Sequence, residues 1–120
     1  MAKTSKTKKD ATSAATGGRA VAGGDVAGKV FAGKSDKPEY LTLKLANRHG
    51  LVTGATGTGK TVTLQVIAEG LSRAGVPVFA ADIKGDLSGV AATGEKKDFI
   101  LARAKDVGID YQPDRFPVIF

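Results

Sequence analysis

Eight consecutive residues of this 120-residue chain combine the chemical groups that bind a phosphate. They read Gly-Ala-Thr-Gly-Thr-Gly-Lys-Thr from position 54 to 61 and match the pattern GxxxxGK[ST]. Glycine lets the backbone take positive φ, so amides approach phosphate oxygens without side chains in the way. The pattern predicts a loop that binds ATP together with Mg²⁺, with these binding residues: Gly54, Ala55, Thr56, Gly57, Thr58, Gly59, Lys60 and Thr61.

Two side chains at the end of this loop have separate expected roles. Lys60 places a positive charge on the terminal phosphates and is a candidate catalytic residue, and the Thr61 hydroxyl is a candidate Mg²⁺ ligand. The alternative is a glycine-rich turn that binds nothing. A dinucleotide-binding pattern GxGxxG starting at Gly57 fails, because its last glycine would fall on Val62.

The flanking sequence predicts the elements that would hold the loop. Residues 51–53 read as the end of a buried strand, and residues 62–74 carry apolar side chains at helical spacing up to Gly75, a suitable C′ residue. Residues 76–81 read as a second strand. The order strand, loop, helix, strand predicts a right-handed βαβ unit of a parallel sheet, whose helix N-terminus favours an anion.

The remaining segments complete an α/β prediction. Residues 26–31 and 40–45 predict an N-terminal β-hairpin with its turn within 33–38. Residues 95–107 predict a second helix that ends at Gly108, with Phe99 and Ala102 facing inward. Residues 118–120 look like the start of another strand. The fold class expected is therefore α/β with a partial parallel sheet and a hairpin.

The first 24 residues differ in composition from the rest. They contain no Ile, Leu, Phe, Tyr or Trp, and their four lysines and one arginine against one aspartate give +4 of the total +6 charge. We predict a disordered, basic, low-complexity tail over 1–24 and an incomplete ATPase domain over 25–120. The tail either contacts nucleic-acid phosphates or is merely solvated.

Composition excludes several other classes of protein. The chain has no cysteine, so it has neither disulfides nor thiolate metal sites, and His49 is its one histidine. No apolar run approaches the roughly 18 residues of a membrane span. We expect a cytoplasmic protein without a membrane partner.

Asp82 follows the second predicted strand, at the sheet edge where α/β proteins bind ligands. One possible role is catalytic, as the carboxylate that holds Mg²⁺ near the phosphates. Another is structural, as a carboxylate that closes a tight turn by accepting from the amides of Lys84 or Gly85. The sequence leaves both roles open.

Residues 47–61, 74–78 and 81–89 resemble the bacterial HerA-like ATPases of the HerA/FtsK superfamily. The Asp-x-Lys-Gly-Asp element formed by Asp82, Lys84, Gly85 and Asp86 makes this resemblance more specific than the glycine-rich loop alone. It implies a P-loop NTPase with a RecA-like sheet, and an ATP- and Mg²⁺-dependent DNA helicase or translocase. It also implies a homo-hexamer, and for Asp82 it adds a substrate-side or coupling role.

The Walker B Asp-Glu, the sensor and the trans-acting arginine of that family have no counterpart up to Phe120. We therefore expect the N-terminal portion of a P-loop ATPase, truncated before Walker B and not competent for hydrolysis alone. A noncatalytic nucleotide-binding module is the alternative. A small-molecule or nucleotide kinase is a third class, but Arg103 and Arg115 are too few and too scattered for its lid.

Overall fold

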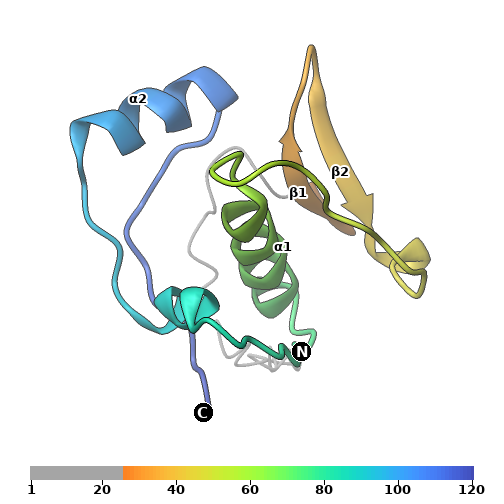
Figure 1. Cartoon of the computed structure of the whole chain (residues 1–120). Coiled ribbons are helices and arrows are strands. Elements are labelled where there is room, and N and C mark those ends of the chain that lie inside the picture. The colour runs from red at the N-terminus through yellow and green to blue at the C-terminus, as the bar shows by residue number, and fades with distance from the viewer. Residues whose placement is uncertain (1–25) are drawn as a thin grey trace, which may run out of the picture.

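The computed structural model describes residues 26–120. Helix α1 lies at the centre, with the hairpin on one side and the segment carrying η2 and α2 on the other (Figure 1). The predicted tail over 1–24 lies outside the described residues. The elements follow in the order β1 (Lys29–Lys34), β2 (Pro38–Thr42), the 3₁₀ helix η1 (Leu43–Leu45), α1 (Lys60–Arg73), the 3₁₀ helix η2 (Asp86–Ala91) and α2 (Asp98–Val107).

The predicted N-terminal hairpin is confirmed. Strands β1 and β2 pair antiparallel, with Phe31 opposite Tyr40 and a register shift between Phe31 and Gly33. The rings of Phe31 and Tyr40 meet edge to face with their centroids 5.8 Å apart. Both strands lie a few residues away from the predicted bounds. Strand β2 ends earlier than predicted because the chain turns into η1 at Leu43, whose amide donates to the Gly28 carbonyl at 2.9 Å.

The packing centre of the described residues joins β1 to α1. Val30 and Phe31 are the buried apolar residues there, only 1% and 6% exposed. Gly70 of α1 is buried as well, and a Cβ atom at this position would overlap the Val30 side chain. Helix and strand can approach so closely because residue 70 has no side chain.

Helix α1 confirms the predicted helix and begins two residues earlier, at Lys60. Its end is the predicted one. Gly75 takes φ of 78°, its amide donates to the Ser72 carbonyl at 3.0 Å, and the Val76 amide donates to the Leu71 carbonyl at 2.9 Å. These two bonds form a Schellman motif, which satisfies carbonyls that the helix leaves free.

Helix α2 ends at the predicted Gly108, which takes φ of 84°, but begins three residues later than expected, at Asp98. The expectation that Phe99 faces inward is wrong, since this residue is 69% exposed. Within residues 26–120 the main contacts between elements join β1 to β2, α1 to β1 and α1 to η2. The ribbon of helix α2 stands apart from that of α1 (Figure 1).

The predicted parallel sheet does not form within residues 26–120. The sheet there contains β1 and β2 only, and segments 51–53, 76–81 and 118–120 run without strand pairing. A parallel strand is defined by hydrogen bonds to a neighbouring strand, and these segments have no such neighbour in the described chain. The apolar side chains of Phe79 and Ile119 are accordingly 95% and 100% exposed.

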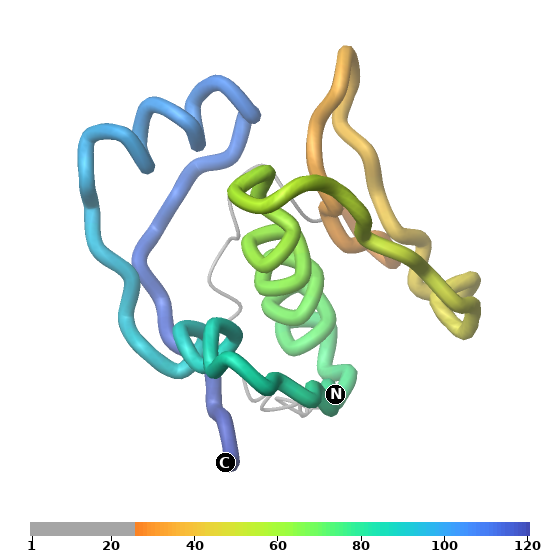
Figure 2. Tube along the Cα trace, viewed as in Figure 1, coloured from red at the N-terminus to blue at the C-terminus, as the bar shows by residue number. Residues whose placement is uncertain are grey.

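The path of the chain sets the position of the glycine-rich loop. Figure 2 shows the chain running from the hairpin into the loop at one end of α1, and returning from the other end toward η2. Among residues 26–120, each helix is too short or too polar to reach across a membrane.

Candidate functional site

The glycine-rich loop enters α1 through a backbone that only glycine adopts readily. Gly54, Gly57 and Gly59 have φ of 157°, 81° and 92°. A Cβ atom at Gly57 or Gly59 would meet no atom within 4 Å. At these two positions glycine is therefore favoured by backbone conformation, and the space beside them is open to a ligand.

Four amides at the end of this loop have no acceptor within residues 26–120. They belong to Gly57, Gly59, Lys60 and Thr61. The last two open α1, where the first N–H groups of a helix lack an intrahelical acceptor and carry the positive end of its dipole. Amides grouped in this way are a donor set that suits an anion such as phosphate.

The Lys60 side chain folds back over the loop. Its Nζ donates to the Ala55 carbonyl at 2.6 Å, and the Thr58 hydroxyl donates to the same oxygen at 2.8 Å. A Cβ atom at Gly54 would come within 2.6 Å of Thr58 Oγ1, so the absence of a side chain at Gly54 leaves room for this hydroxyl. The structure thus places the Lys60 ammonium on the Ala55 carbonyl of the loop, and its predicted role toward the terminal phosphates stays a prediction.

Thr61 is the second residue of α1 and is partly buried. Its hydroxyl donates to no atom of residues 26–120, whereas the Thr63 hydroxyl, two residues further on, donates to the Gly59 carbonyl at 3.1 Å. Mg²⁺ takes oxygen ligands, and the role of the Thr61 hydroxyl as one of them stays a prediction. Thr56 is exposed on the loop.

Asp82 organises a turn after the extended segment. Its Oδ1 accepts from the Lys84 amide at 3.1 Å, and its Oδ2 accepts from the Leu87 amide at 2.7 Å. Asp82 therefore closes a turn, which is one of the roles that the sequence left open. The amide of Lys84 is a donor, as expected, and the second donor is the amide of Leu87 and not that of Gly85. A carboxylate oxygen accepts more than one bond, so these two bonds leave capacity for a further partner.

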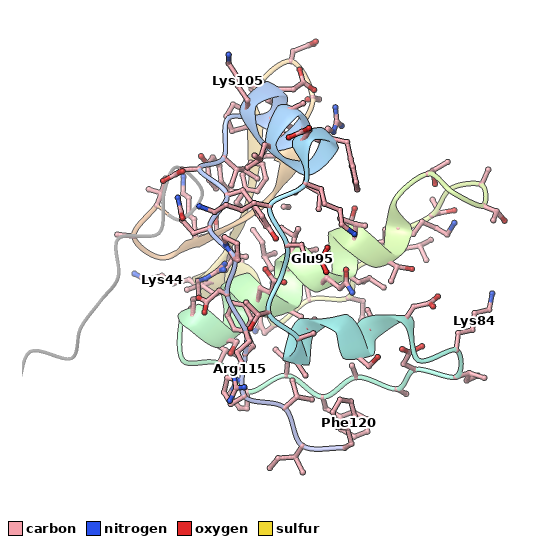
Figure 3. The ribbon with its side chains drawn as sticks, turned by 90° about the vertical axis from the view of Figure 1, so that its left-hand side faces the viewer. Lys44, Lys84, Glu95, Lys105, Arg115 and Phe120 are labelled. Carbon is pink, nitrogen blue, oxygen red and sulfur yellow. The ribbon has the colours of Figure 1, made fainter. Side chains whose placement is uncertain are left out.

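The turn that Asp82 closes is attached to α1. Gln65, one helical turn after Thr61, donates through Nε2 to the Asp86 carbonyl at 3.0 Å. A Cβ atom at Gly89 would lie 3.3 Å from the same Nε2. This link places the 82–88 turn beside the first turns of α1, and Lys84 points away from the body of the molecule (Figure 3).

Sequence reasoning missed Gln65. The i, i+4 spacing of Thr61 and Gln65, which puts both on one side of a helix, is the signal that would have pointed to it.

A second cluster lies at the opposite end of α1. The guanidinium of Arg73 lies over the Phe116 ring, 4.7 Å from its centroid, and its Nη2 is 3.8 Å from Glu69 Oε2. Burial raises the pKa of Glu69, Arg73 opposes this shift, and Asp114 adds to it. The cluster holds the C-terminal segment against α1, and the sequence analysis did not anticipate it.

The hairpin, the glycine-rich loop and the helix that follows define a small α/β unit. The chain belongs to the family described as "Helicase HerA-like C-terminal", whose model matches residues 28–120. Comparisons with curated proteins and with solved structures found no significant match. The matched range contains the loop and the Asp82 turn, and the resemblance to HerA-like proteins is confirmed at the family level. That residues 25–120 form the N-terminal part of an ATPase domain stays a prediction.

Proposed function

We propose that residues 54–61 bind ATP with Mg²⁺, and that this chain is the ATP-binding segment of a HerA-like DNA helicase or translocase. The observation that carries the proposal is the donor set of the loop. Four amides without protein acceptors in residues 26–120, from Gly57 to Thr61, lie together with the Lys60 ammonium at the start of α1. Membership of a helicase-related family supports the same class of protein.

In this proposal each residue has a defined task. The amides hold phosphate oxygens, and Lys60 moves its ammonium from the Ala55 carbonyl to the terminal phosphates. Thr61, with Asp82 as a further candidate, holds Mg²⁺ through oxygen atoms. Within residues 26–120 no three His, Cys, Asp or Glu side chains form a metal-binding group, so these ligands would act together with the phosphates. Mg²⁺ would neutralise charge on the phosphates when bound.

The larger assembly belongs to the proposal as well. We propose a RecA-like parallel sheet in which segments 51–53, 76–81 and 118–120 become strands, and a cytoplasmic homo-hexamer that acts on DNA. The exposed apolar side chains of these segments, such as Phe79 and Ile119, support this view, because buried parallel strands are rich in such residues.

A noncatalytic nucleotide-binding module is the second candidate. It is favoured by Asp82, whose two oxygens already serve the amides of Lys84 and Leu87. In that case the loop binds ATP and Mg²⁺, and no carboxylate of this chain takes part in hydrolysis.

Calorimetric titration with ATP and Mg²⁺ tests the proposal. Lys60→Ala should weaken ATP binding on the order of tenfold to a hundredfold, because it removes a charged hydrogen bond to phosphate. Lys96→Ala is the matched control, since Lys96 is an exposed lysine remote in sequence from the loop, and this variant should bind as the unaltered chain does. Equal affinity in the two variants contradicts the assignment.

Measurement of ATP turnover tests whether Asp82 has a catalytic role. We expect little or no ATP hydrolysis by the 120-residue chain. Turnover near 1 s⁻¹, within the usual range of enzymes, contradicts that expectation. Its loss in Asp82→Asn would then assign Asp82 to Mg²⁺, whereas ATP binding without turnover in both chains agrees with both candidates.

A further inference from the structure

Thr58 occupies a variable position of the GxxxxGK[ST] pattern, yet its hydroxyl connects two parts of the loop. Its Oγ1 donates to the Ala55 carbonyl at 2.8 Å, and its amide lies 3.4 Å from the same oxygen. The hydroxyl also fills the space next to Gly54, where a Cβ atom would come within 2.6 Å of it. The side chain therefore fixes the width of the loop.

The Ala55 carbonyl has two strong donors, Thr58 Oγ1 at 2.8 Å and Lys60 Nζ at 2.6 Å. A carbonyl oxygen has two lone pairs, so both bonds fit at once. Lys60 is also the group that the proposed function assigns to the terminal phosphates. When its ammonium turns toward a phosphate, the bond to Ala55 weakens and Thr58 is the donor that stays.

We propose that Thr58 is a positioning residue for nucleotide binding, an inference that rests on the proposed function. Its hydroxyl keeps the Ala55 carbonyl bonded and the loop in shape while Lys60 serves the phosphates. Without this hydroxyl, the Ala55 carbonyl has no side-chain donor once Lys60 moves to the phosphates. The bond between Lys60 and Ala55 then opposes that movement. Loss of one hydrogen bond of this kind corresponds to about a twofold to tenfold loss of affinity.

Three variants isolate the hydroxyl. Thr58→Val removes it and keeps the shape of the side chain, Thr58→Ser keeps it and removes the methyl group, and Thr58→Ala repeats the loss without a β-branch. Thr93→Val is the matched control, because Thr93 is an exposed threonine that lies outside residues 54–61. Each chain is titrated with ATP and Mg²⁺ by calorimetry, and its Tm is measured with and without ATP.

The expected result is about a twofold to tenfold weaker ATP affinity for Thr58→Val and Thr58→Ala, against unchanged affinity for Thr58→Ser and Thr93→Val. The Tm without ATP should stay the same, because Lys60 still bonds the Ala55 carbonyl. Unchanged ATP affinity in Thr58→Val overturns the inference. So does an equal loss in Thr58→Ser, or a fall in Tm without ATP, since either would indicate packing alone.

The unaltered chain in the same titration separates this inference from the proposed function. If it binds no ATP, the proposed function is contradicted, and the role of Thr58 falls with it. If it binds ATP and the valine and alanine variants bind equally well, only the role of Thr58 is contradicted.

Discussion

At the scale of single residues, backbone conformation and free amides define the glycine-rich loop. Gly57 and Gly59 take positive φ in open space, and the amides of Gly57, Gly59, Lys60 and Thr61 have no acceptor in the described chain. The spacing in the sequence predicted the glycine-rich loop, which in the structure leads into α1 at Lys60. It could not locate the donors to the Ala55 carbonyl, because variable positions of a pattern carry no information about side-chain direction.

Asp82 provides a test at the same scale. Asp82→Ala should speed amide hydrogen exchange at Lys84 and Leu87, because each amide loses its acceptor, worth about 1 kcal/mol per bond. Asp82→Asn keeps one acceptor oxygen and should have a smaller effect. Exchange measured by NMR checks this, with Asp86→Ala as a neighbouring control. Unchanged exchange in Asp82→Ala contradicts the turn-closing role.

Glu69 predicts a pH dependence of stability. Its pKa is raised above 4.5 by burial, so the folded chain binds a proton more tightly there than the unfolded chain does. The corresponding stability is present below pH 4.5 and is lost as the pH rises through the folded pKa. Glu69→Gln should flatten this decline in the free energy of unfolding. An unchanged pH profile in the variant contradicts the assignment to Glu69.

At the scale of elements, local sequence signals predicted the hairpin and both helices. They could not predict which segments far apart in the sequence pair with one another. The helix ends at Gly75 and Gly108 were predictable because a C′ glycine acts on its own helix. The apolar run over 76–81 was predicted as a strand from its residues, but a strand exists only with a partner strand. The Gln65 link between α1 and the Asp82 turn joins residues far apart in sequence.

The packing of α1 on β1 gives the prediction for this scale. Gly70→Ala should destabilise the chain by about 1–3 kcal/mol, because the new methyl group overlaps Val30 in the packing centre. This loss should exceed the gain of up to about 1 kcal/mol from better helix propensity. Gly50→Ala, where an added Cβ meets nothing within 4 Å, is the control in chemical denaturation. A more stable Gly70→Ala chain contradicts the described packing.

At the scale of the whole molecule, charge and exposed apolar surface are unevenly distributed. Residues 1–24 carry most of the formal charge of +6. Phe79, Ile83, Ile119 and Phe120 are exposed on the described part, and Phe120 points outward at its end (Figure 3). Composition predicted the charge distribution. The exposure of these apolar side chains was not predicted, because the parallel sheet expected from the sequence does not form in residues 26–120.

Deleting residues 1–24 tests whether the basic tail contributes to DNA binding but not to ATP binding. ATP affinity should not change, because the loop and its donors lie within the described residues. Any DNA affinity that the tail supplies should fall, and the logarithmic salt slope on duplex should decrease by about 0.9 for each phosphate that the chain no longer neutralises. DNA affinity that survives the deletion would place the DNA-binding surface on the remaining chain, where Lys84 is exposed. Weaker ATP binding after the deletion contradicts the expectation that residues 1–24 take no part in nucleotide binding.

The most direct test of phosphate binding by the loop is an NMR titration of the backbone amides with ATP and Mg²⁺. The amides of Gly57, Gly59, Lys60 and Thr61, which have no protein acceptor in residues 26–120, should shift most and saturate together. Amides of β2, such as that of Leu41, should move little, because this strand (residues 38–42) lies outside residues 54–61. Saturating ATP that leaves the four loop amides unshifted would contradict nucleotide binding at this site.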